Sequence, residues 1–130
     1  MSSKQMVDRG AEASSALDSL RELDLSTIEV AAVPEELLGD LLATATRVES
    51  QAAALRGAVL AEADRRKTAL RTAASGTDAW AVEFTGDTRE MNAGGLRIAR
   101  LLEEKYHATR DAFAAGLVTK AQVRVIVNAA

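Results

Sequence analysis

The fold of this chain depends on one stretch, residues 34–72, which reads PEELLGDLLATATRVESQAAALRGAVLAEADRRKTALRT. Apolar side chains recur in it alternately three and four residues apart, the spacing that aligns one stripe along a helix. The stripe consists of Leu38, Leu41, Ala45, Val48, Ala52, Leu55 and Val59. This spacing predicts one long helix over about 34–72, which at 1.5 Å per residue would run for roughly 50–60 Å.

A helix of that length needs a partner, and two arrangements are open. The rest of the chain can pack along it, or a second copy can pair with it. The stripe contains two alanines and is interrupted after Val59 by Glu62 and Arg66. An antiparallel bundle within one chain is therefore the simpler fold, and self-association through the long helix is the alternative.

The composition favours helices throughout. Aromatic residues make up 3% of the 130 residues and the chain has one Pro, whereas strands are rich in aromatic and β-branched side chains. We predict an all-α bundle of five or six helices without a sheet. Two domain segments are expected, a short helix with a connector over 1–33 and a helical domain over 34–130. The chain stops at Ala130 without Gly, Pro or a charged tail, so we expect that the domain is truncated there.

The boundaries follow from local signals. Residues 1–7 are expected to be frayed, and a short helix is expected to end near Leu23 before the connector DLSTIEVAAV (24–33). Pro34 suits the first position of the long helix. Gly39 and Gly57 inside it suggest a close approach of another backbone. The basic run at 65–67 is expected to stabilise the end of the helix, and phosphate binding is the alternative.

Several shorter helices are expected after the long one. Residues 75–78 and 85–88 have the composition of turns with helix caps, and Asp87 stands three residues before Glu90 in capping-box spacing. Helices are predicted for about 79–84, 91–105, 108–115 and 120–130. Trp80, the only tryptophan, is expected to be a buried structural anchor. Gly116 is expected to end the helix before it and to form the turn to the last helix.

The last two helices carry the only pattern that suggests nucleic-acid binding. Residues 1–84 contain 9 Lys/Arg against 14 Asp/Glu, whereas 85–130 contain 7 against 5, so only the second part has a positive balance. Ala112 and Gly116 have the spacing of a helix-turn-helix, although Val123 falls one residue later than its apolar position. If the helices bind double-stranded DNA, the exposed candidates are Thr119, Lys120, Gln122 and Arg124. The alternative is a plain helical hairpin in the core.

No catalytic or metal-binding pattern is present. The chain has no cysteine and one histidine, which excludes a thiolate zinc site, a Cys nucleophile and a histidine cluster within the sequence. His107 is expected to be a surface or helix-capping residue. No cofactor and no small-molecule substrate are indicated. The apolar run AAALRGAVLA (52–61) is too short to span a bilayer and contains Arg56. A cytoplasmic location without membrane contact fits these features.

Five segments together resemble a known family. They are LAEADRR (60–66), DAW (78–80), TGDT (85–88), LRIARLL (96–102) and AFAAGLVTKAQVRVI (112–126). They resemble the actinobacterial 13E12-repeat family, also called domain of unknown function 222, although Asn92 stands where the family usually has Ala. The resemblance implies a non-catalytic helical domain that often precedes an HNH endonuclease module of mobile elements or phages. A divalent metal would be needed only if such a module follows. We expect the helical domain to contribute DNA binding or positioning, and a structural or self-association module without DNA contact is the alternative.

Overall fold

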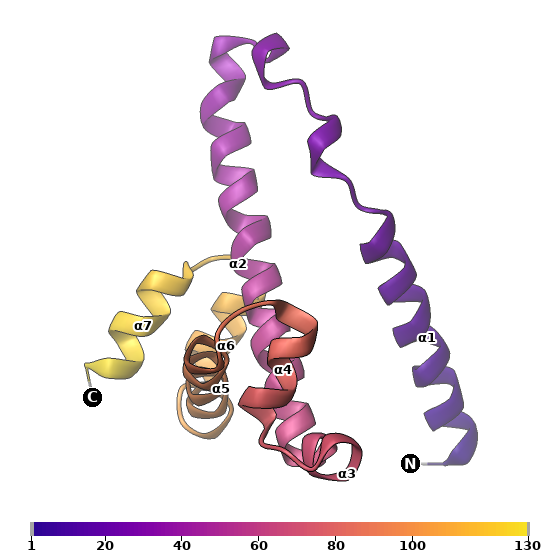
Figure 1. Cartoon of the computed structure of the whole chain (residues 1–130). Coiled ribbons are helices and arrows are strands. Elements are labelled where there is room, and N and C mark those ends of the chain that lie inside the picture. Colours follow the sequence, from indigo (N-terminus) through magenta and orange to yellow (C-terminus); the bar gives the residue numbers. More distant parts are fainter. Residues whose placement is uncertain (1, 130) are drawn as a thin grey trace. The chain divides into compact units, whose positions relative to one another are not determined.

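The computed structural model describes residues 2–129, and in this range the protein is all-α (Figure 1). No strand occurs among the described residues, as the composition predicts. The helices are α1 (Ser3–Glu22), α2 (Glu35–Arg65), α3 (Thr68–Ala73), α4 (Thr77–Thr85), α5 (Arg89–Glu104), α6 (His107–Ala114) and α7 (Lys120–Asn128). These seven helices of the described range exceed the five or six expected.

The chain divides into two units, residues 1–37 and 38–130. In the first unit, α1 begins at Ser3, so the prediction of a frayed start over 1–7 is wrong for the described residues 2–7. A capping box explains the early start. The Gln5 backbone N donates to Ser2 Oγ (3.2 Å), and the Ser2 backbone N donates to Gln5 Oε1 (3.1 Å), which satisfies two amides at the helix end. No residue of α1 is buried.

The connector between α1 and α2 contains two 3₁₀ turns, Leu25–Thr27 and Val30–Ala32. Asp24 starts the first turn, because its Oδ1 accepts a hydrogen bond from the backbone N of Ser26 (3.0 Å). Pro34 directly precedes the first residue of α2, and its carbonyl oxygen accepts from the backbone N of Leu37 (2.9 Å). The predicted start of the long helix is correct to within one residue.

The predicted end of the long helix at Thr72 is wrong, because α2 ends at Arg65 and α3 is a separate helix. The chain turns at Lys67, which has a φ of 56° in the left-handed region that side chains other than Gly rarely adopt. Tertiary contacts hold this turn. Asp64 accepts a hydrogen bond from Thr77 Oγ1 of α4 (2.8 Å) and pairs with Arg100 of α5 (3.5 Å). The split into α2 and α3 adds a helix to the expected number.

In the second unit, α3 to α7 gather around the C-terminal half of α2 (Figure 1). The buried residues of α2 are Ser50, Leu60, Ala61 and Ala63. Gly57 provides the close approach that was predicted, since a Cβ built on it would lie 3.3 Å from Ala99 Cβ of α5. Gly39 does not, because nothing lies within 4 Å of its added Cβ. The two helical glycines of α2 therefore differ in their role.

The main core cluster lies where the last three helices meet. It consists of Leu102 of α5, Phe113 of α6, and Val123 and Val127 of α7. Val123 is fully buried. The position one residue later than the helix-turn-helix pattern expects is thus the one that anchors α7 in the core.

The turn before α5 differs from its prediction. Thr88, not Asp87, caps the helix, and its Oγ1 accepts from the backbone N of Met91 (3.1 Å). The Asp87 carboxylate instead accepts a hydrogen bond from Arg56 of α2 (2.5 Å). Asp87 therefore forms an ion pair with another helix instead of the helix cap that its spacing predicted.

Candidate functional site

The four residues predicted to contact DNA lie at the start of α7, where two of them already cap the helix. Thr119 Oγ1 accepts from the backbone N of Gln122 (3.2 Å), and Gln122 Oε1 accepts from the backbone N of Thr119 (2.8 Å). This is a capping box, which satisfies two backbone amides at the end of the helix. The interaction explains the presence of Thr and Gln at this spacing without a ligand.

The other two predicted residues, Lys120 and Arg124, are exposed and one helical turn apart. Residues four apart lie on the same side of a helix, and Asn128 continues this row. Arg97 of α5 reaches the same row, because it donates to Asn128 Oδ1 (2.7 Å). The structure thus brings a third cation, Arg97, to the flank of Lys120 and Arg124. Gln122 is two residues from each of them, and by the helical period it lies on a different side.

The remaining exposed side of α7 is apolar. Val125 is 70% exposed, and Leu117 in the preceding turn is 76% exposed. A shallow groove runs between Val118, Ala121, Gln122, Val125 and Ile126. Val125 and Ile126 are also apolar, but the buried residues of α7 are Val123 and Val127.

Gly116 connects α6 and α7 in a backbone conformation that suits glycine. Its φ is 77°, the backbone N of Leu117 donates to Ala112 O (2.8 Å), and that of Gly116 donates to Phe113 O (3.0 Å). This pair of bonds is the Schellman motif that ends many helices. Gly116 also lies against α2, since an added Cβ would be 2.9 Å from the carbonyl oxygen of Arg47. Its predicted place as a helix terminator agrees with this geometry.

Trp80 is half-buried, not fully buried as expected of an anchor. Its ring packs at a tilt of 54° on Phe84, one turn later in α4, with 4.9 Å between the ring centroids. Phe84 is itself 69% exposed. The aromatic pair therefore lies at the surface of α4, whereas the buried residues of that helix are Thr77 and Ala81.

The predicted stripe of α2 is largely exposed, although Ala63, four residues after Val59, is buried. Leu38, Leu55 and Val59 are 43%, 50% and 54% exposed, and Leu41 and Val48 are half-buried. At 100° per residue, the stripe is centred opposite the side that contains Ser50, Gly57 and Ala61. We call the seven residues from Leu38 to Val59 the outer stripe. Since all of them belong to the second unit, they form an apolar surface of that unit.

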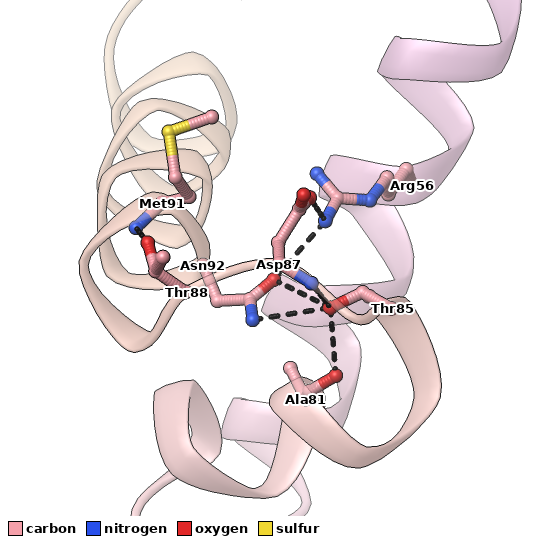
Figure 2. Close-up of polar contacts among 7 residues, drawn as sticks. All are labelled: Arg56, Ala81, Thr85, Asp87, Thr88, Met91 and Asn92. Carbon is pink, nitrogen blue, oxygen red and sulfur yellow. Dashed lines mark hydrogen bonds and ion pairs between the residues drawn. The ribbon is translucent and has the colours of Figure 1, made fainter.

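A polar cluster ties α2 to the turn between α4 and α5 (Figure 2). Arg56 donates to Asp87 Oδ2 (2.5 Å) and to Asn92 Oδ1 (3.1 Å). Thr85 Oγ1 donates to Ala81 O (2.9 Å) and lies 3.2 Å from Asn92 Nδ2. Asn92 is fully buried. No sequence pattern predicted this cluster, and its one signal was Asn92 at a position where the resembled family has Ala.

The basic run at the end of α2 has partners on its own helix. Arg65 and Arg66 both bind the carboxylate of Glu62, the latter at 2.6 Å. These hydrogen bonds lower the pKa of Glu62 from 4.5 to about 2. In the same way, the hydrogen bond from Arg89 lowers the pKa of Asp78. Two of the three cations of the basic run thus pair with an acidic residue one turn earlier in the chain.

The acidic side chains and the histidine of the described residues do not converge on a metal site. No group of three or more His, Asp or Glu side chains there could hold a metal ion. His107 Nε2 lies 2.6 Å from the carbonyl oxygen of Glu103, at the end of α5, as a capping role requires.

None of the described helices has both the length and the hydropathy needed to cross a bilayer.

Comparison of the chain with known protein families, curated proteins and solved structures finds no match. The resemblance to the 13E12-repeat family therefore rests on the five quoted segments alone. Two surfaces of the second unit stand out, the outer stripe of α2 and a cationic flank formed by Arg97 of α5 with Lys120 and Arg124 of α7.

Proposed function

We propose that this chain is a non-catalytic helical module that associates with a second copy of itself through the outer stripe of α2. The observation that carries the proposal is the exposure of the stripe. Seven apolar or small side chains at alternating spacing of three and four are the seam of a coiled coil. Five of the seven residues of the stripe are exposed, and Leu41 and Val48 are half-buried.

The order of residues along the stripe favours an antiparallel pair. In a parallel pair in register each residue meets its own copy, so Ala45 would face Ala45 and Ala52 would face Ala52, which leaves voids in the seam. In an antiparallel pair centred near residue 50, Ala45 faces Leu55 of the partner and Ala52 faces Val48. Large side chains then lie opposite small ones, and Leu41 lies opposite Val59.

The proposal is tested by measuring the mass of the chain in solution by light scattering and sedimentation equilibrium over a range of concentrations. The expected mass is that of two chains. Leu55→Lys should reduce it to one chain, because it places a charge in an apolar seam. The matched control is Leu70→Lys in α3, which changes an exposed leucine outside the stripe (61% exposed, against 50% for Leu55) and should leave the pair intact. A mass of one chain for the wild type at high concentration would overturn the proposal.

Cysteine cross-linking tests the orientation, since the sequence has no cysteine of its own. An antiparallel pair should give a disulfide between Val48→Cys and Ala52→Cys chains when the two variants are mixed. A parallel pair should instead give disulfides within each variant alone. Circular dichroism of each variant controls for loss of helix.

DNA positioning is the second candidate, and the cationic flank of α7 favours it. Arg97, Lys120 and Arg124 lie on the surface of α5 and α7, and the hydrogen bond from Arg97 to Asn128 holds the first of them beside α7. Three exposed cations on adjacent helices suit contacts with phosphates, which position a protein on the duplex. The resemblance to the 13E12-repeat family also supports this candidate. Under this proposal, the chain is the helical domain ahead of an HNH endonuclease module in a cytoplasmic protein.

Fluorescence anisotropy of labelled duplex DNA tests this candidate at low and at physiological salt. Replacing Lys120 and Arg124 together by Ala should weaken binding and reduce the salt slope by nearly one unit for each phosphate that is no longer neutralised. The control is the replacement of Arg9 and Arg21 in α1, which carry the same charge outside the flank. If the wild type binds DNA and the double variant of α7 binds it equally well, this flank is not the DNA-binding surface.

A further inference from the structure

A cavity of about 430 Å³, partly open to solvent, lies in the second unit between α2, α5, α6 and α7. Its interior side chains are apolar, and five of them are buried. These are Leu60, Ala99, Leu102, Phe113 and Val123. The cavity exists because α2 faces it with small residues, Ala53, Ala54 and Gly57, and α5 contributes Gly95. Small residues at these positions keep the two helices close at Gly57 but leave the space beside that contact unfilled.

An apolar space of this size suits an organic molecule better than water. Every buried polar side-chain atom among the described residues has a hydrogen-bond partner in the protein, so none requires a water molecule. An enclosed apolar cavity of about 150 Å³ takes up benzene. The present cavity is nearly three times as large and is partly open to solvent, and its volume is within the range of small-molecule sites. It has room for two or three rings.

The charged residues of the lining indicate a neutral ligand. Three are acidic, Glu49, Glu103 and Asp111, and three are basic, Arg56, Arg110 and Lys120. Arg56 is held by Asp87 and Asn92, and Arg110 donates to Asp111 (3.0 Å). Five of the six, all except Arg56, are exposed, so they mark the side on which the cavity reaches the surface. The balance of signs leaves no net charge for an anionic or cationic head group.

We propose that this cavity binds a neutral, predominantly apolar organic molecule of two or three rings. The proposal is independent of self-association and of DNA positioning, since it uses neither the outer stripe nor the cationic flank except Lys120 at the rim. The ligand would be enclosed by α2 and α5 and would contact Phe113 and Val123 at its inner end.

Titration with N-phenyl-1-naphthylamine, a neutral dye whose emission rises in an apolar site, tests the proposal on the full chain. Saturable binding of one dye per chain is expected. Ala54→Leu places three more carbon atoms in the cavity and should weaken dye binding at least tenfold. Ala43→Leu, the same change at an exposed position of α2 outside the cavity, should leave it unchanged. Absence of saturable binding to the wild type, or equal binding by both variants, would overturn the proposal.

Methyl NMR of the wild type keeps the proposal testable if Ala54→Leu does not fold. Intermolecular NOEs from the dye to Ala99 and Val123 are expected. NOEs confined to Leu55 and Val59 of the outer stripe, or to Val125 of α7, would place the dye on an exposed apolar surface and overturn the cavity site.

Discussion

Gly116 lies against the backbone of Arg47, although the two residues are far apart in the sequence. A Cβ added to Gly116 would be 2.9 Å from the Arg47 carbonyl oxygen and 2.5 Å from its Cγ. Gln51, one turn later in α2, donates to the neighbouring Ala115 carbonyl (3.3 Å). The turn between α6 and α7 thus packs directly against α2, and the position of α7 depends on this contact.

Gly116→Ala should therefore destabilise the fold by about 1–3 kcal/mol, because it combines strain at a φ of 77° with a clash against α2. Urea unfolding followed by circular dichroism measures the change. Gly39→Ala is the matched control, since Gly39 lies in the second turn of α2 and nothing lies within 4 Å of its added Cβ. That control should stabilise the fold by up to about 1 kcal/mol. Equal effects of both changes would contradict the contact.

Asn92→Ala should cost about 1–3 kcal/mol in the free energy of unfolding, because it removes an acceptor of Arg56 and a donor to Thr85 inside the structure. The comparison is Arg89→Ala, which breaks the more exposed ion pair with Asp78 and should have a much smaller effect. Denaturant unfolding of both variants shows whether Asn92 stabilises the fold or is a buried polar residue without effect on stability. A neutral Asn92→Ala would show that the cluster contributes nothing.

The free energy of unfolding should decrease as the pH falls from about 4.5 to about 2, in part because of Glu62. Its pKa is lowered from 4.5 to about 2 by the hydrogen bonds from Arg65 and Arg66. The folded state therefore favours the charged carboxylate, a contribution present above the ordinary pKa and lost as the pH falls through the lowered one. NMR titration of the Glu62 side chain should find the low pKa in the wild type and a higher one in Arg65→Ala. An unchanged pKa in that variant would exclude Arg65 as its cause.

Thr119→Ala should cost about 1 kcal/mol and fray the start of α7, because the backbone N of Gln122 loses its acceptor. Thr119→Ser keeps the hydroxyl and should retain most of the stability. Hydrogen exchange of the amides in the first turn of α7 measures the fraying. If the serine variant exchanged as fast as the alanine variant, the capping hydroxyl would not be what holds this turn.

The sequence alone predicted the elements whose causes are local. The Ala-rich composition with one Pro made the chain helical, Pro34 marked the start of α2 within one residue, and Gly116 marked the turn before α7. The roles of these residues depend on backbone conformation and on hydrogen bonds within one turn of a helix. Such interactions need no knowledge of the rest of the fold.

Only the tertiary structure decided which side of α2 faces the core. The apolar spacing pointed to the outer stripe, yet α5 packs on the small residues around Gly57, because a short side chain there lets two helices approach closely. In the same way, Asp87 had the spacing of a cap but binds Arg56, and α2 ended where Asp64 binds α4 and α5. Each of these outcomes depends on residues distant in the sequence, whose proximity no local pattern records.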